Sequence, residues 1–217
     1  MRLIGLMLRC RTWIAGAGVA LLLAGGGSGA VAAPSGELVR GAAAITSVHS
    51  PYARLRPIAV LSAERLAISD LVAAAKWGTG SPIDDPVRER QVLDAVAEQA
   101  RRLGADPVVT VRIFRDQIEA SKVVQRGLHR VWDADPSQAP TERPDLGEVR
   151  KEINRISGEL VRAIAGSADA RSAPSCGPVL AAAAVRVRHE RRLDGLHTGA
   201  LARALPSVCV DGDGGEG

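Results

Sequence analysis

The sequence has few of the residues on which many functions depend. Aromatic residues make up 2% of the 217 residues, which is too few for the stacking platforms that bind single-stranded nucleic acid. No Ser-His-Asp arrangement or glycine-rich phosphate loop stands out, and neither His189 nor His197 has a metal-ligand spacing to the cysteines. No segment alternates with period two for long, and no internal repeat is present. These absences favour an all-α chain and exclude nucleic acid and a metal from the expected ligands.

The first 32 residues have the pattern of a signal peptide. Three arginines precede an apolar run over residues 13–23, and Ala30-Val31-Ala32 forms an A-x-A cleavage site. An uncleaved membrane anchor is the alternative, but the apolar run is short for a membrane span. Cys10 lies before the apolar run and therefore does not support a lipid anchor. We expect an exported protein, periplasmic or secreted, with no membrane attachment after cleavage.

Removal of this peptide changes the charge balance and leaves two cysteines. Three of the 28 Lys and Arg residues leave with it and none of the 24 Asp and Glu residues, so the mature chain is nearly neutral. The pI of about 9.4 is therefore no argument for a nucleic-acid partner. In an oxidising compartment Cys176 and Cys209 favour a disulfide, with two buried thiols as the alternative. Such a disulfide would contribute about 3–4 kcal/mol of stability in the chain-entropy model.

Helical periodicity and start signals organise the mature chain into a single domain. Residues 33–56 have no sustained period, so we expect a mobile or loosely docked segment before the domain at 57–210. Asp85-Pro86 and Asp106-Pro107 resemble an N-cap followed by proline, and Asp145 with Glu148 has capping-box spacing. After residue 210 the acidic, glycine-rich tail is expected to be disordered. The expected helices cover residues 58–77, 86–103, 107–132, 146–165 and 178–205.

Two helical stripes carry polar groups where apolar core residues are expected. Arg65 and Lys76 lie eleven residues apart, close to three helical turns, and therefore share a face. In the helix over 107–132, Ser121 and Gln125 occupy the middle of an otherwise apolar seam. Burying such groups without partners costs several kcal/mol for a charge and about 1–3 kcal/mol for an amide or hydroxyl. The pattern predicts a bundle that binds an anion in its interior.

Further charges lie near these stripes. Asp85, Arg88 and Glu89 begin one helix, and a solvated helix start with internal ion pairs is the simpler interpretation for that segment alone. Arg150 flanks an apolar stripe, where arginines often extend toward water. Taken with the two stripes, these groups suit a small dianion that carries a hydroxyl. Because no nucleophile or histidine base is evident, we expect chemistry that needs only orientation and electrostatics.

Three motifs in order resemble one known family. They are Glu64-Arg-Leu through Lys76-Trp77, then Pro-Ile-Asp-Asp-x-x-Arg-Glu-Arg over 82–90, then Arg112-Ile-Phe-x-x-Gln-Ile-x-x-Ser-x-x-x-Gln125. This order and spacing is similar to the all-helical chorismate mutases and covers about residues 61–209. The signal peptide, Pro-Asp-Leu-x-x-x-Arg150, Ser-Ala-Pro-Ser-Cys176 and the late Cys209 resemble their exported subgroup. The resemblance implies a helical bundle with a disulfide-tethered C-terminal helix, a homodimer with each site in one chain, and no cofactor.

The resemblance also implies a reaction and a role for each site residue. Chorismate would rearrange to prephenate by a pericyclic Claisen reaction. Arg65 and Arg150 would bind the substrate carboxylates with help from Ser121, and Lys76 and Gln125 would contact the ether oxygen. The remaining residues would shape the site and hold the ring hydroxyl: Asp85, Arg88 and Glu89.

One departure from the exported subgroup concerns the partner of the ether oxygen. Some exported relatives have glutamine at the position of Val92 and glutamate at that of Gln125, whereas here the pair is apolar and neutral, as in the cytoplasmic form. The competing hypothesis is a secreted helical binding protein that keeps the scaffold without activity. It predicts gaps in the charged set, and the sequence has none.

Overall fold

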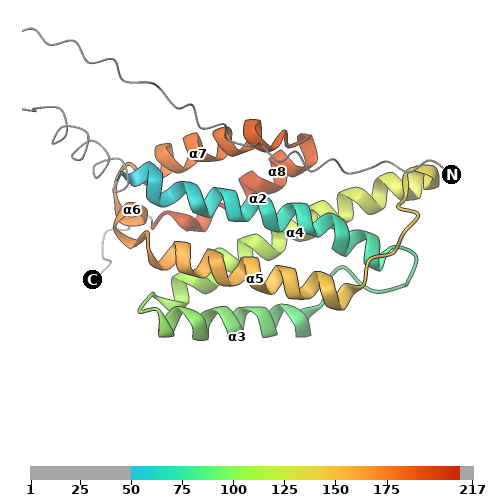
Figure 1. The fold of residues 1–217 in the computed structure, drawn as a ribbon, viewed down its shortest axis with the longest axis horizontal. Coiled ribbons are helices and arrows are strands. Elements are labelled where there is room, and N and C mark those ends of the chain that lie inside the picture. The colour runs from blue at the N-terminus through green and yellow to red at the C-terminus, as the bar shows by residue number, and fades with distance from the viewer. Residues whose placement is uncertain (1–49, 211–217) are drawn as a thin grey trace, which may run out of the picture.

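The computed structural model of this chain describes residues 50–210, which form helices and no strand. Figure 1 shows the long helices side by side in one bundle. The all-α prediction is therefore confirmed. The elements in chain order are α2 (Pro51–Lys76), α3 (Pro86–Arg102), α4 (Pro107–Ala134), η1 (Pro136–Gln138), α5 (Leu146–Ala165), α6 (Ala168–Ser172), α7 (Cys176–Arg191), α8 (Gly195–Ala204) and η2 (Pro206–Val208).

The predicted aspartate caps begin three of these helices. Asp85 Oδ1 accepts a hydrogen bond from the Arg88 amide at 3.0 Å, and Asp145 Oδ1 accepts one from the Glu148 amide at 2.9 Å. Asp106 accepts from two amides of the first turn of α4. Each cap satisfies backbone donors that have no partner within the helix. The starts of α3, α4 and α5 were thus predictable from local sequence.

The prediction for residues 51–56 was wrong, because α2 begins at Pro51 and contains Pro57. Ser50 caps the helix by accepting from the Ala53 amide at 3.2 Å, and Pro51 occupies the first turn, where a missing N–H costs nothing. Leu55 and Ile58 are fully buried, so this first part of α2 belongs to the core. Residues 33–49, the predicted signal peptide at 1–32 and the predicted tail at 211–217 lie outside the described residues.

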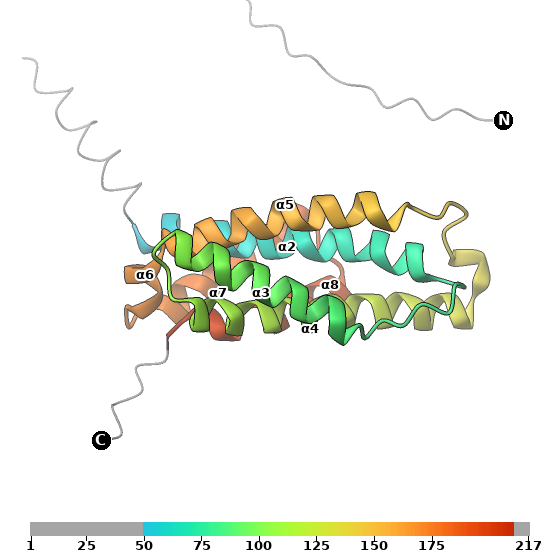
Figure 2. The ribbon, with the colours of Figure 1, turned by 90° about the horizontal axis from the view of Figure 1, so that it is seen from below.

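Helix α2 is central to the bundle, because it contacts α4, α5, α7 and α8. Figure 1 shows α3 at one edge and α7 at the opposite edge, with α2 and α5 between them, and Figure 2, seen from below, shows α3 in front and α5 along the upper edge. Helix α3 packs against α4 and α5, while α8 packs against α4. Gly127 permits this last contact, because a Cβ there would lie 2.6 Å from Leu196 Cδ1. The arrangement surrounds the polar stripes of α2 and α4 with α3 and α5.

The last helix predicted at 178–205 is in fact two helices. Helix α7 ends at Arg191, and Arg192 adopts a left-handed conformation with φ 51°. Asp194 then caps α8 by accepting from the His197 amide at 2.8 Å. The break lets the chain fold back, so that α7 packs on α2 and α8 packs on α4.

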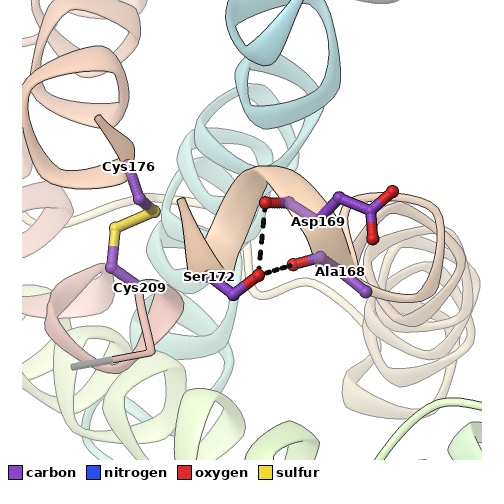
Figure 3. The surroundings of a disulfide bond; sticks show 5 residues. All are labelled: Ala168, Asp169, Ser172, Cys176 and Cys209. Carbon is purple, nitrogen blue, oxygen red and sulfur yellow. Dashed lines mark hydrogen bonds between the residues drawn. A yellow bond between two sulfur atoms is a disulfide. The ribbon is translucent and has the colours of Figure 1, made fainter. Parts of the chain in front are cut away.

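A disulfide between Cys176 and Cys209 ties the start of α7 to the segment after η2 (Figure 3). It confirms the predicted pairing of the two mature cysteines. The short helix α6, where Ser172 Oγ donates to backbone oxygens of Ala168 and Asp169, lies beside it. None of the helices in the described part of the chain is long and apolar enough to cross a membrane.

Candidate active site

A cavity lies between α2, α3, α4, α5 and the loop that joins α2 to α3. All eight residues that the sequence put forward for the site line this cavity. The residues around it are Arg65, Val72, Lys76, Ile83, Asp85, Arg88, Glu89, Val92, Ile118, Ser121, Lys122, Gln125, Leu146, Arg150 and Ile153. The structure therefore brings together residues that are up to 85 positions apart in the chain, while their roles remain predictions.

Arg65 of α2 is a buried cation without a carboxylate partner. Its side chain donates to Ser157 Oγ on α5, and its guanidinium lies over the Phe114 ring at 5.3 Å from the centroid. Its Nε is buried and has no hydrogen-bond partner within residues 50–210. Burial lowers the pKa of Arg65 to about 10, which still leaves the group charged at neutral pH. An anion in the cavity would remove much of the cost of this burial.

Lys76 at the end of α2 reaches across to the loop that precedes α3. Its Nζ donates to the backbone oxygens of Pro82 at 2.9 Å and Ile83 at 3.3 Å. Burial lowers the pKa of Lys76, the charge of Asp85 acts against this, and the nearby charge of Arg150 lowers it further. An ammonium has three donors, so the third N–H of Lys76 is available to a ligand.

Polar groups of α2 and α4 form a connected chain of hydrogen bonds along the cavity wall. Ser69 Oγ donates to the Arg65 carbonyl at 3.0 Å, and it lies 2.7 Å from Ser121 Oγ. Gln125 Nε2 donates to Ser121 Oγ at 3.2 Å, while the buried Gln125 Oε1 has no partner among the described residues. The amide nitrogen of Gln125 carries two N–H groups, so one can stay bonded to Ser121 while the other is offered to a ligand. Gln125 can therefore offer a donor to a ligand in the cavity.

The start of α3 supplies charges of both signs. Glu89 Oε1 accepts from the Asp85 amide at 3.3 Å, while Asp85 accepts from the Arg88 amide, which together make a reciprocal cap. Arg88 Nη2 donates to Asn154 Oδ1 on α5 at 3.1 Å. The simpler interpretation of this segment, a helix start with local pairing, describes its backbone contacts, but its side chains also line the cavity.

The cations of the cavity outnumber the carboxylates that could neutralise them. Among residues 50–210, no carboxylate forms an ion pair with Arg65, Lys76, Arg88 or Arg150. The carboxylate of Glu89, by contrast, is paired with the fifth cation, Lys122. A cavity with this balance favours a ligand with more than one negative charge.

Sequence reasoning missed three polar residues that shape the site. Ser69 and Ser157 hold Ser121 and Arg65, and each also bonds to the carbonyl four residues earlier in its own helix. Lys122 is adjacent to Ser121 in the chain but points to the side of α4 that faces Glu89. The spacing from Glu119 through Lys122 to Arg126 was the available signal, because charges three and four residues apart share a helix face.

Comparison with known proteins agrees with this geometry. The family "Chorismate mutase type II" matches residues 57–126. The chain is 36% identical over 173 residues to the secreted chorismate mutase of Mycolicibacterium smegmatis, which covers 77% of this chain and 96% of that protein. It is 36% identical over 148 residues to the secreted chorismate mutase of Mycobacterium tuberculosis, which covers 68% and 74%. The crystal structure of chorismate mutase from Burkholderia thailandensis superposes with a TM-score of 0.69 at 35% identity, covering 72% of this chain and 99% of that one. The chain belongs to the helical chorismate mutase family.

Proposed function

We propose that this protein is an exported chorismate mutase that converts chorismate to prephenate without a cofactor. The observation that carries the proposal is the cavity in which Arg65, Lys76, Arg88 and Arg150 have no carboxylate partner. Chorismate is a small dianion with a ring hydroxyl and an enolpyruvyl ether, and it matches this set of charges. Family membership supports the same reaction.

The reaction breaks a C–O bond and forms a C–C bond within one molecule, and it transfers no proton. Arg65 of α2 and Arg150 of α5 bind the two carboxylates of chorismate, and Ser121 assists them. This clamp holds the enolpyruvyl arm over the ring, so the two carbon atoms that form the new bond lie close together before the reaction. No acid, base or nucleophile is required, which agrees with a cavity that contains no histidine.

Negative charge develops on the ether oxygen as the C–O bond breaks. Lys76 directs its third N–H to this oxygen, and Gln125 donates the second N–H of its amide from the opposite wall. Both donors are held in place before the reaction, Lys76 by the Pro82 and Ile83 carbonyls and Gln125 by Ser121. They therefore stabilise the transition state more than the bound substrate.

The start of α3 closes the remaining side of the site. Glu89 accepts a hydrogen bond from the ring hydroxyl, and Arg88 and Asp85 shape the wall around it. Val92 and Ile118 exclude water from the ring, which strengthens each electrostatic contact in the cavity.

Export and assembly complete the proposal. The two mycobacterial relatives are secreted proteins by name, and the disulfide fits an oxidising compartment. We propose cleavage after Ala32 and a periplasmic or secreted mature enzyme that begins at residue 33. We also propose a helical homodimer in which each site is built within one chain, since all eight predicted site residues meet around one cavity and none has to come from a partner.

The direct test is the loss of chorismate absorbance on addition of purified mature protein, with a chelator present and no cofactor. We expect prephenate as the product at a rate first order in enzyme. A folded, oxidised protein that binds chorismate but leaves it unchanged would favour the alternative, a secreted binding protein on the same scaffold.

A further inference from the structure

Lys122 forms the densest ion-pair cluster in the described part of the chain. Its Nζ lies 2.8 Å from Glu89 Oε1, 2.8 Å from Glu119 Oε1 and 3.2 Å from Asp84 Oδ1. The Lys122 side chain is 10% exposed, whereas most surface ion pairs of this protein involve lysines and arginines that are far more exposed. Arg126, one turn later on α4, adds a second cation against Asp84 at 2.7 Å.

These contacts tie three separate segments together. Glu119, Lys122 and Arg126 are on α4, Glu89 is in the first turn of α3, and Asp84 is in the loop before α3. The same loop provides the carbonyls of Pro82 and Ile83 that hold Lys76. Lys122 therefore anchors both the carboxylate of Glu89 and the loop on which Lys76 depends.

Lys122 lines the cavity, yet its ammonium is already surrounded by carboxylates. It donates a hydrogen bond to Glu119 Oε1 and forms ion pairs with Glu89 and Asp84. Burial lowers the pKa of Lys122, but its hydrogen bonds to Glu119, Glu89 and Asp84 outweigh burial and raise the pKa above the ordinary value. Lys122 therefore stays charged and paired with these carboxylates, whereas Lys76 keeps one N–H available to a ligand.

We propose that Lys122 is a positioning residue for the rearrangement, which acts by fixing and neutralising Glu89 and by holding the loop over residues 82–85 against α4. The inference rests on the proposed function, because it concerns the same cavity. Neutralising Glu89 matters for charge as well as for geometry. Without Lys122 the carboxylate would face an incoming dianion, and its repulsion would offset part of the attraction of the four unpaired cations.

A purely structural lysine predicts something different. If Lys122 only stabilised the fold, its replacement would lower the melting temperature and leave the kinetics of the folded molecules unchanged. If it positions Glu89, its replacement changes kcat and KM in protein that is still folded. Misplacement of a site group by about 1 Å can cost roughly 100-fold in rate.

The split of the effect between KM and kcat gives a second readout that a structural role would not move. Glu89 is faced by Lys76 from α2, by Asp84 and Asp85 from the loop, and by Glu119, Lys122 and Arg126 from α4. Removal of the Lys122 charge leaves acidic groups in the majority there, so an incoming dianion would be repelled more strongly. The variant should therefore raise KM for chorismate, while the misplacement of Glu89 lowers kcat.

The experiment compares mature wild type, Lys122→Gln and Lys151→Gln. Lys151 is the matched control, because it also pairs with a glutamate three residues away but is 73% exposed on α5. We expect kcat/KM of Lys122→Gln to fall roughly 10- to 100-fold with a raised KM, and that of Lys151→Gln to stay within about twofold of wild type. Lys122→Gln with wild-type kcat and KM would overturn the positioning role. An inactive wild type would instead overturn the proposed function.

A double-mutant cycle tests whether Lys122 acts through Glu89. In a Glu89→Gln background the replacement Lys122→Gln should cost much less than it does alone, since the carboxylate to be positioned is gone. Full additivity of the two losses would contradict the mechanism. If Lys122→Gln fails to fold, Lys122→Gln with Glu119→Gln removes one charge of each sign and carries the same expectations. Wild-type kinetics in that folded double variant would also overturn the proposal.

Discussion

Two buried cations show how differently the two halves of this molecule treat charge. Arg65 in the cavity and His197 in the first turn of α8 are 7% and 9% exposed. Arg65 has a serine and an aromatic ring as neighbours but no carboxylate. His197 lies between two carboxylates, with Nε2 2.9 Å from Asp70 Oδ1 and Nδ1 2.9 Å from Asp194 Oδ1. The cavity is arranged to receive negative charge, whereas His197 is already paired with one carboxylate from α2 and one from the segment between α7 and α8.

This difference assigns separate tasks to the two regions. Unpaired buried charge destabilises the empty cavity, and only a ligand can compensate for it. The C-terminal region consists of α7, α8 and η2, and it contributes paired charges, a disulfide and buried apolar residues such as Leu201. Changes in the cavity should therefore affect catalysis more than stability, and changes in the C-terminal region should do the reverse.

The largest expected effect is that of Lys76→Ala in the cavity. Removal of one preorganised donor to a developing oxyanion commonly costs 100- to 1000-fold in turnover. The melting temperature should change little, because among residues 50–210 Lys76 forms no ion pair and only two hydrogen bonds, both to the loop. Steady-state kinetics on chorismate and a thermal melt of the same preparation measure both quantities.

Lys151→Ala is the control for Lys76→Ala, since it removes an exposed lysine of α5. It should leave both turnover and melting temperature near those of wild type. Near-normal turnover of folded Lys76→Ala would remove Lys76 from the proposed mechanism.

The opposite pattern is expected when the disulfide is removed. Replacement of Cys176 and Cys209 by serine opens a covalent loop with a sequence separation of 33 residues. The chain-entropy model gives a loss of about 3–4 kcal/mol, which corresponds to a fall in melting temperature of about 10 °C. The activity per folded molecule should remain, because neither cysteine lines the cavity.

Chemical denaturation of the oxidised and the double-serine protein measures this loss. Intact mass with and without alkylation first establishes that wild type contains no free thiol. A double variant with normal stability but low turnover would reverse the division between the two regions.

The sequence predicted the cavity better than it predicted the ends of the helices. The residues of the polar stripes were identifiable because a buried charge without a partner contradicts ordinary core composition. The start of α2 was missed because Pro57 suggested a break, although Ser50-Pro51 has the same cap-and-proline pattern as Asp85-Pro86. The break between α7 and α8 was missed because Arg192 adopts positive φ without the glycine that usually marks such a site.

Lys122 illustrates what periodicity alone does not give. It was not predicted, because its importance depends on Glu89 and Asp84, which the fold brings to it from another helix and a loop. A local pattern can show that a lysine lies on a given helix face. It cannot show which carboxylates from distant segments will lie against that face.

Gln125→Glu gives a smaller effect, whose size depends on pH. The amide of Gln125 can donate at any moderate pH, so wild-type activity should vary little between weakly acidic and neutral solution. A glutamate at this buried position must be protonated to donate to the ether oxygen. Burial would raise the pKa of that glutamate and Lys76 would lower it, but in either case the active form is the protonated one.

The kcat/KM of Gln125→Glu should therefore be highest at acid pH and fall as pH rises. Gln117→Glu serves as a comparison on the same helix, because Gln117 is buried against Ser62 and Ala204 rather than in the cavity. Gln117→Glu should lower the free energy of unfolding and leave the pH profile of kcat/KM unchanged. A flat or rising profile for Gln125→Glu would place Gln125 outside the reacting centre.

The smallest expected effect is a pH dependence of stability that arises from His197. Two carboxylate acceptors require both ring nitrogens of His197 to carry protons. The hydrogen bond to Asp70, and then that to Asp194, raise the pKa of His197 to about 9 despite burial. Since the unfolded value is about 6.5, this contribution is fully present below pH 6.5 and is lost as pH rises through 9. Because Asp70 and Asp194 are largely exposed, screening should reduce the contribution to about 1–2 kcal/mol.

Urea denaturation of wild type and His197→Gln between pH 6 and pH 10 measures this contribution to the free energy of unfolding. The stability difference between the two should shrink toward pH 10, while their activities per folded molecule stay alike. A difference that is constant over this range would mean that His197 stabilises α8 by packing alone.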